Sequence, residues 1–590
     1  MQDCFDTLYV HSVSGHHFYD LTELMCSKDN IRLAYRNVKR NTGSKTAGTD
    51  KLTIADILHL SVEDVVVQVQ AMFRRYELQT VRRVFIPKGI GKTSPLGIPT
   101  IWDRIFQQCI LQILEPICEA KFHKHSYGFR PNRSTHHAKA RLEFLINQAG
   151  LQHCVDVDIK GFFDNVNHSK LLKQMWSLGL RDKSLLSIIS RLLKAEIEGE
   201  GIPTKGTPQG GILSPLLSNI VLNELDWWIS DQWETFESRY TYSTNGSKYQ
   251  HLKKTALKEC FIVRYADDFK IMCRTRSHAI KMNYAVKDFL NNRLHLETSE
   301  EKSKVINLKK NSSEFLGFSI KAVRKGKTRF GYVARSNMSK KAKANAFHKI
   351  KEAIKVVKKK PCIQTVWNFN TVVMGIQNYY SVATNITINL NELNAHLRKT
   401  LYNQLKNIRT EASFQDMTKT LQKRYKGYKA RLFKIQQMVF VPIHAQKWKT
   451  TLCFSQTTCN FTTEGRAKIH NNLKAIDKTM LTYIMRNYIP NRSIEYNDNR
   501  ISKFIAQYGK CAILGEELGI NEWHCHHINP YSLFKDDSYS NLIVVHKAIH
   551  QLIHLKDNVK IETLLQSLRI NNKQKEKVNK LRLKCQNAII

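Results

Sequence analysis

The stretch FIVRYADDFKIMC, at residues 261–273, decides the fold. Apolar and β-branched residues flank a Tyr-Ala-Asp-Asp core, which predicts a strand, a tight turn that carries the acids, and a second strand. Adjacent carboxylates repel each other, and burying them without a counter-charge costs free energy. A divalent cation resolves this conflict, and phosphoryl transfer uses such cations to clamp the attacking and leaving oxygens. We therefore predict that Asp267 and Asp268 bind metal; two solvated acids on a surface turn are the alternative for this stretch alone.

A third acid lies upstream, in CVDVDIKGFFDNV at residues 154–166. Alternating Val and Asp predict a strand with Asp158 at its end. Between these two stretches, GTPQGGILSP at residues 206–215 predicts a turn that opens an apolar helix, because Pro and Ser favour helix starts. The presence of a third acid weighs against the solvated-turn alternative.

Two further segments combine basic and turn residues. RRVFIPK at 82–88 and SPLGIPT at 94–100 predict a hairpin in which Arg82 and Lys88 share one face, because they lie an even number of positions apart. Two cations on one face suit a triphosphate, although an edge strand kept soluble by charge fits this segment equally well. SYGFRPNRS at 126–134 places aromatic residues between arginines, which suits stacking on bases; a structural loop is the alternative.

The composition restricts the class of partner. The 590 residues include 92 Lys and Arg against 50 Asp and Glu, a formal net charge of +42, and an excess spread so widely indicates a polyanionic partner. Nucleic acid is favoured over membrane, because the sequence has no long apolar run and no lipidation motif. We expect no signal peptide and, from 13 scattered cysteines, a reducing compartment.

The ordered set of motifs resembles the reverse transcriptase domain of group II intron-encoded proteins. Each motif alone is a weak signal, and their family order carries the resemblance. The set comprises the 126–134 loop, the 154–166 strand, the Pro-Gln-Gly turn, the Tyr-Ala-Asp-Asp turn, Glu301-Lys302 and FLGF at 315–318. The resemblance implies an α+β fold, a right-hand polymerase with fingers, palm and helical thumb.

The same resemblance implies roles for individual residues. Asp158, Asp267 and Asp268 would hold two Mg²⁺ while a primer 3′-hydroxyl attacks the α-phosphate of a dNTP. The residues implied for the nucleotide are Arg82 and Lys88 on the triphosphate, Phe163 as a gate against the 2′-hydroxyl, Gln209 on the sugar and base, and Lys302 as proton donor to pyrophosphate. A solvated Lys302 is the alternative to that last role.

The C-terminal part resembles an HNH endonuclease module, through HCHHINP at 524–530, an Asn, and histidines one turn apart on a helix. Histidines at i and i+4 share a helix face and can bind one metal ion. The motif implies a divalent cation, Mg²⁺ or similar, beside a base that activates water. The residues implied are His526, His550 and His554 as ligands, His527 as the base, and Asn541 orienting it.

Spacing alone leaves part of this site open. His546 is also one turn from His550, so the ligand pair is not unique. Cys511 and Cys525 have no Cys-x-x-Cys partners, which argues against a structural zinc. An inactive, decayed module is the alternative to a working nuclease.

The resemblance also implies a domain order. The predicted parts are fingers and palm at 1–335, thumb and maturase region at 336–455, a DNA-binding segment at 456–500, a small ββα-metal HNH domain at 501–560, and a basic tail, a solvated helix, at 561–590. We name no RNA-binding residue in 336–455, because Tyr and Leu in helices are usually core and Lys is usually solvated.

The function implied is that of a reverse transcriptase and maturase. The chain would bind group II intron RNA, promote splicing, nick target DNA and copy the RNA from the new 3′ end with dNTPs. The rival interpretations are an RNA-binding splicing cofactor without polymerase activity and another retroelement polymerase, such as a retron enzyme. We expect a bacterial cytoplasmic protein, nucleoid-associated when it acts on DNA, with no membrane partner. The sequence leaves the oligomeric state open, a dimer included.

Overall fold

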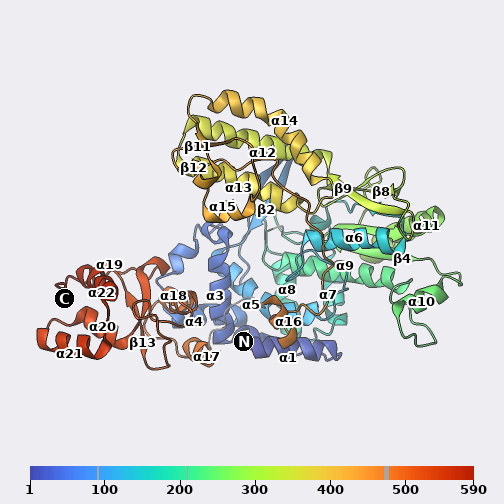
Figure 1. Cartoon of the computed structure of the whole chain (residues 1–590). Coiled ribbons are helices and arrows are strands. Elements are labelled where there is room, and N and C mark those ends of the chain that lie inside the picture. The colour runs from blue at the N-terminus through green and yellow to red at the C-terminus, as the bar shows by residue number, and fades with distance from the viewer. Residues whose placement is uncertain (90–91, 209, 471–477) are drawn as a thin grey trace. The chain divides into compact units, whose positions relative to one another are not determined.

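The Tyr-Ala-Asp-Asp turn joins two neighbouring strands of a four-stranded antiparallel sheet in the computed structural model (Figure 1). The sheet order is β4-β5-β3-β6. Its strands are β4 (Cys260–Tyr265), β5 (Asp268–Cys273), β3 (His153–Val157) and β6 (Lys304–Asn307). The strand–turn–strand predicted over 261–273 and the strand predicted to end near Asp158 are both present. Continuous apolar runs fit this sheet, because nearly every residue of β4 and β5 is buried.

The structure describes residues 1–590 except 90–91, 209 and 471–477, and it divides into two compact units. The first unit comprises Met1–Lys121, Leu171–Leu217 and Cys459–Ile590. The second unit comprises Phe122–Lys170 and Ser218–Thr458. Each is described by itself below. Among the described residues, no helix is both long and apolar enough to cross a bilayer.

Helices and a second small sheet surround the four-stranded sheet in the second unit. Helix α6 contacts β4, and helix α11 contacts β3, β5 and β6. The elements are α6 (Thr135–Ala149), α9 (Ser214–Asp231), α10 (Asn245–Leu252), α11 (Arg276–Asp288), β7 (Ser313–Phe315), β8 (Phe318–Arg324) and β9 (Tyr332–Met338). Helix α6 shows why the sequence folds in this way locally. Ser134 caps its start by accepting a hydrogen bond from the His137 amide, and Gly150 ends it in the left-handed conformation.

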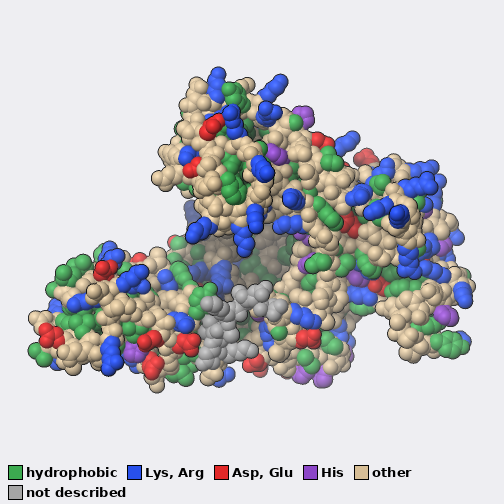
Figure 2. All heavy atoms as spheres, viewed as in Figure 1, with side chains coloured by type: hydrophobic (Ala, Val, Ile, Leu, Met, Phe, Trp, Pro, Cys, Tyr) green, Lys and Arg blue, Asp and Glu red, His purple; other side chains and the backbone are tan. Residues whose placement is uncertain are grey.

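The same unit ends in a helical part with its own core. Its elements are α12 (Lys340–Lys359), α13 (Ile363–Tyr380), α14 (Ile386–Leu405), β10 (Thr410–Ala412), α15 (Lys419–Arg424), β11 (Leu432–Ile435) and β12 (Met438–Val439). Ile350, Phe369 and Leu397, one from each long helix, are fully buried together in that core. Figure 2 shows Lys and Arg side chains outnumbering acids over this part. Apolar stripes inward and lysines outward are the pattern of an amphipathic bundle.

The first unit combines helices from the N-terminal part of the chain with residues Cys459–Ile590. Its N-terminal elements are α1 (Gln2–Val13), α2 (Leu21–Met25), α3 (Lys28–Arg40), α4 (Val62–Arg74), β1 (Arg82–Gly89), β2 (Lys92–Ile98), α5 (Ile101–Glu119), α7 (His168–Ser177) and α8 (Lys183–Leu193). Strands β1 and β2 form the predicted antiparallel hairpin. The register of this hairpin shifts between Pro87 and Gly89. The prediction that Arg82 and Lys88 share one face assumed strict alternation, and the shift interrupts that alternation.

The C-terminal elements of the first unit are α16 (Thr463–Ile469), α17 (Lys478–Arg486), α18 (Ile494–Ala506), β13 (Trp523–His527), α19 (Tyr531–Phe534), β14 (Leu542–His546), α20 (Lys547–His554), α21 (Asn558–Leu568) and α22 (Asn572–Lys584). Helices α17 and α18 share one core with β13, β14 and α20. The segment predicted as a solvated helix after 560 instead forms α21 and α22. Ile561, Val578 and Leu581 are buried in this core, because apolar residues recur on one face of a Lys-rich sequence.

Candidate functional site

Strand register gathers the three predicted polymerase acids. Val157 lies opposite Phe269 in the β3–β5 ladder, and Asp158 and Asp268 are the next residues toward the same end of the sheet. Asp267 occupies the turn that joins β4 to β5. Three carboxylates from two distant segments therefore meet at one edge of the sheet. The carboxylate oxygens of these three acids do not all lie within 4.8 Å of one another. In the described part of the chain, ligand atoms of three histidines do lie that close.

Lysines accompany two of these acids. Lys302 Nζ lies 3.0 Å from Asp158 Oδ2 at the exposed side of the site. Lys270 Nζ lies 3.2 Å from Asp268 and 2.5 Å from Asp156, and its side chain is 3% exposed. The predicted role of Lys302 as proton donor stays a prediction: its side chain is 69% exposed, and it pairs with a candidate metal ligand.

Lys270 and Asp156 form a buried pair that sequence analysis did not single out. Burial alone would lower the pKa of Lys270, but the Asp268 and Asp156 carboxylates outweigh burial and raise it. Burial likewise raises the pKa of Asp268, against the opposing effect of Lys270. Lys270 therefore neutralises charge beneath the turn. The antiparallel pairing of Asp156 with Lys270 is the signal that could have revealed this contact once the two strands were aligned.

Buried contacts hold the turn in shape. The Arg264 guanidinium lies 2.6 Å from Asp226, with both side chains almost fully buried, and it also donates to the Ala266 carbonyl. Ala266 itself has φ of +56°, which is strained for a residue with a side chain. The Gly128 Cα packs on this residue so closely that a Cβ there would lie 2.2 Å from the Ala266 amide nitrogen. A fixed backbone therefore presents the acids.

The 126–134 loop has a structural role as well as an exposed aromatic ring. Tyr127 is 2% exposed, and Arg130 donates to the carbonyls of His123 and Ser126. These two residues act as the structural loop that was the alternative to base stacking. Phe129 is 50% exposed, and its ring centroid lies 6.4 Å from that of the predicted gate residue Phe163. Phe129 is therefore the aromatic residue of this loop that is exposed, and it lies beside the predicted gate.

The candidate triphosphate-binding residues belong to the first unit. Arg82 is exposed and donates to the Ala47 carbonyl. The Lys88 side chain and Gln209 lie outside the described residues. Gly210 follows Gln209 with φ of +112°, and a Cβ there would lie 2.4 Å from the Gly97 carbonyl oxygen. Gly210 therefore packs directly on strand β2, an approach that only glycine permits.

The predicted HNH ligands come together from strand β13 and helix α20. One ligand atom from each of His526, His550 and His554 lies within 4.8 Å of the other two. Burial and the neighbouring histidines lower the pKa of His526 and of His550 to about 3, so both imidazoles are neutral at pH 7. Neutral imidazole is the form that binds metal, and three nitrogen donors suit a divalent ion such as Zn²⁺. His546 instead caps α20 through its Nδ1, which separates it from this group.

The predicted base His527 follows His526 in β13 and is buried. Its Nε2 lies 2.8 Å from Asp537 Oδ1, and its ring stacks on Tyr496 with centroids 5.2 Å apart. Asn541 instead accepts from the Asn529 amide and donates to carbonyls of Asn529 and Asp536. The side chain that orients His527 is therefore Asp537, and Asn541 fixes the loop between the strands. Sequence analysis missed Asp537, because ten residues separate it from His527 and no motif marks it.

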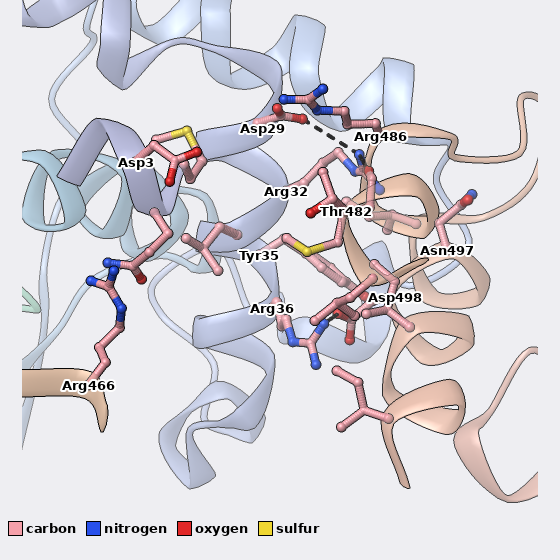
Figure 3. Close-up of a pocket in the computed structure, with 18 residues that line it drawn as sticks. Asp3, Asp29, Arg32, Tyr35, Arg36, Arg466, Thr482, Arg486, Asn497 and Asp498 are labelled. Atoms are coloured by element: carbon pink, nitrogen blue, oxygen red, sulfur yellow. Dashed lines mark hydrogen bonds and ion pairs between the residues drawn. The ribbon is translucent and has the colours of Figure 1, made fainter. Parts of the chain in front are cut away.

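A separate cavity of about 580 Å³ lies in the first unit (Figure 3). Helices α3, α17 and α18 contribute most of its lining. Arg32 pairs with Asp29 at 3.7 Å, and Arg36 pairs with Asp498 at 3.4 Å, so these two arginines of its wall have acidic partners. The lining includes none of the predicted catalytic residues.

Comparisons with known proteins match the two parts of the chain that carry these residues. Residues 86–320 match the family Reverse transcriptase (RNA-dependent DNA polymerase), and residues 508–552 match the family HNH endonuclease. The chain is 29% identical over 460 residues to the group II intron-encoded protein LtrA of Lactococcus lactis subsp. cremoris, covering 66% of this chain and 74% of LtrA. This chain is a group II intron-encoded reverse transcriptase and maturase with a C-terminal HNH endonuclease domain.

Two further relatives are similar to this reverse transcriptase. Protein YkfC of Escherichia coli (strain K12) is 31% identical over 300 residues, covering 48% of this chain and 78% of YkfC. The putative COX1/OXI3 intron 1 protein of Saccharomyces cerevisiae is 28% identical over 333 residues, covering 51% of this chain and 39% of that protein.

The predicted α+β class, with a polymerase part followed by an HNH domain, is confirmed, and so are the two enzyme activities. The splicing cofactor without polymerase activity is not favoured. Reverse transcriptases and HNH endonucleases use divalent metal ions, and the family binds RNA and DNA.

Proposed function

We propose that this group II intron-encoded protein binds its own intron RNA, promotes its splicing, nicks a DNA target and copies the RNA from the new 3′ end. The β3–β5 register is the observation that carries the polymerase assignment. It supports placing Asp158 beside Asp268 and beside the turn that contains Asp267. The three-histidine group supports the nicking step. Both steps act on phosphodiester chemistry and both need divalent cations.

The polymerase residues divide the work of nucleotide addition. Carboxylate oxygens are the ligands that Mg²⁺ prefers, so we assign Mg²⁺ to Asp158, Asp267 and Asp268. When bound, Mg²⁺ would stabilise negative charge on the attacking and leaving oxygens. The primer 3′-hydroxyl loses its proton to solvent, its oxygen forms a bond to the α-phosphorus, the bond to pyrophosphate breaks, and Lys302 gives a proton to the leaving oxygen.

The remaining nucleotide contacts are proposed from the motifs. Arg82 and Lys88 hold the triphosphate of a dNTP, and Gln209 contacts its sugar and base. Phe163 rests on Phe129 and excludes a 2′-hydroxyl by its bulk. The close packing of Gly210 on Gly97 supports one nucleotide-binding surface made by the hairpin and the Pro-Gln-Gly turn.

The HNH residues cleave one DNA strand. His526, His550 and His554 hold a divalent cation, which would polarise the scissile phosphate. His527 takes a proton from water, the water oxygen attacks phosphorus, the bond from phosphorus to the 3′-oxygen breaks, and that oxygen takes a proton from solvent. Asp537 holds the His527 ring and stabilises its protonated form. The freed 3′-hydroxyl is the primer that the polymerase requires.

The wider setting is also proposed. The net charge of +42 supports binding of the polyanionic intron RNA and target DNA. We place the protein in a bacterial cytoplasm, on the nucleoid when it acts on DNA, and assign no oligomeric state.

Primer extension on an RNA template tests the polymerase assignment. The wild-type protein should extend a DNA primer with dNTPs and Mg²⁺, and Asp267→Ala/Asp268→Ala should abolish extension while RNA binding persists. Glu297→Gln, at an exposed carboxylate paired with Lys160, is the matched control and should leave extension intact. Extension by the double variant would overturn the assignment of the acids.

A further inference from the structure

A thiol lies beside the three-histidine group. Cys585 follows helix α22, is half-buried, and its Sγ lies 3.8 Å from His526 Nε2. His526 is 3% exposed. Among the described residues, the Cys585 thiol is the polar partner of the His526 ring nitrogen Nε2. A buried imidazole thus faces two histidines and one sulfur.

The separation fits two ligands of one metal ion. Typical distances are about 2.3 Å for Zn–S and about 2.0–2.1 Å for Zn–N, which at a tetrahedral angle place sulfur and nitrogen about 3.5 Å apart. The Cys585 sulfur is not within the 4.8 Å group of histidine atoms, so the proposal requires a rotation about its Cα–Cβ bond. That bond belongs to a short side chain with a single heavy-atom torsion.

Buried hydrogen bonds fix the backbone of Cys585 to the helix that carries two of the histidines. Arg582 is 2% exposed, and its guanidinium donates to the Leu552 and Leu555 carbonyls at the end of α20. Asn587 donates to the Ile553 carbonyl at 2.9 Å. Residues on both sides of Cys585 therefore anchor it to α20, so its position follows that of His550 and His554.

We propose that Cys585 is the fourth protein ligand of the metal held by His526, His550 and His554. The inference rests on the proposed assignment of those histidines. On binding, the thiol loses its proton to solvent and the thiolate donates an electron pair to the ion. One thiolate and three imidazoles select a borderline-soft ion such as Zn²⁺ over Mg²⁺, and four protein ligands complete a tetrahedral shell. A DNA phosphate reaches the ion by displacing Cys585 or by adding a fifth ligand.

Cobalt(II) substitution of the full-length, metal-stripped protein tests this proposal, because thiolate-to-cobalt charge transfer gives an absorption band that imidazole does not. The wild-type protein should bind one Co²⁺ with that band and with intense tetrahedral d–d bands. Cys585→Ser should lose the charge-transfer band, keep Co²⁺ on the histidines, and bind Zn²⁺ at least about 10-fold more weakly. Cys453→Ser, at an exposed cysteine elsewhere, is the control and should match the wild type.

The other outcomes distinguish failure of the Cys585 proposal from failure of the histidine assignment. Co²⁺ bound without the charge-transfer band would overturn the role of Cys585 and leave the three-histidine site standing. His524, whose ring centroid lies 3.7 Å from that of His550, would be the fourth ligand if its Ala variant then lost the tetrahedral d–d intensity. A charge-transfer band that survives His550→Ala would arise from another site and would also overturn the proposal. Absence of Co²⁺ binding would overturn the histidine assignment itself.

Discussion

Lys302 Nζ lies 3.0 Å from Asp158 Oδ2, although 144 residues separate the two in sequence. The pair joins the end of β3 to the loop before β6, next to the turn that carries Asp267 and Asp268. Lys302 can therefore act either as a proton donor or as a counter-charge that positions Asp158. The two roles make different predictions for substitutions.

Lys302→Ala should slow nucleotide addition by about 10²–10⁴-fold if Lys302 is a general acid. Lys302→Arg keeps a cation beside Asp158, but the guanidinium does not release a proton near neutral pH. We expect Lys302→Arg to be as slow as Lys302→Ala in single-turnover extension. Full activity of the Arg variant would show that charge alone is required. Because the pair is exposed, neither change should unfold the protein.

Lys270→Met should destabilise the second unit by about 3–5 kcal/mol, since it leaves two carboxylates without their buried counter-charge. Adding Asp156→Asn should recover part of this loss, and a double-mutant cycle by chemical denaturation measures the coupling. Additive effects of the two substitutions would contradict a direct Lys270–Asp156 interaction.

Gly128→Ala should impair both folding and DNA synthesis, because the new methyl group would meet the Ala266 amide nitrogen at 2.2 Å. Gly375→Ala is the matched control in the same unit. A Cβ there meets nothing within 4 Å, and the helical position should be stabilised by about 0.5–1 kcal/mol. Thermal denaturation and primer extension of both variants provide the comparison.

Asp537→Asn should reduce DNA nicking, because the amide does not stabilise a protonated His527 as a carboxylate does. His527→Ala should reduce nicking by about 10²–10⁴-fold, and Asp537→Asn by a smaller factor. Neither substitution should change primer extension. Nicking by Asp537→Asn at the wild-type rate would remove Asp537 from the site.

The stability of the first unit should depend on pH through Asp103. Burial raises the pKa of this carboxyl to about 6, from 3.8. Its stabilising contribution is therefore fully present below pH 3.8 and is lost as pH rises through 6. Relative to the wild type, the free energy of unfolding of Asp103→Asn should rise by up to about 2–3 kcal/mol between pH 4 and pH 7. Urea denaturation at both pH values checks this, with the exposed Asp3→Asn as control; a gain independent of pH would refute it.

The motifs could be predicted from the chemistry of their residues and from the local spacing of apolar residues around them. The acid turn, the Asp158 strand, the basic hairpin and the His-His strand each combine a functional residue with a recognisable local pattern. The partners of these residues could not be predicted in this way. Asp537 and Cys585 carry no motif, and their relation to His527 and His526 depends on how strands and helices pack.

The sequence by itself determined which residues carry charge, which can ligate metal and which segments are strands, because these properties depend on residue type and short-range periodicity. Only the tertiary structure decided that Lys270 neutralises Asp156 and Asp268, that Arg130 is a structural residue, and that the Lys-rich C-terminus packs against helix α20. These contacts depend on strand register and on which helix face finds a buried partner, and both are set by long-range packing.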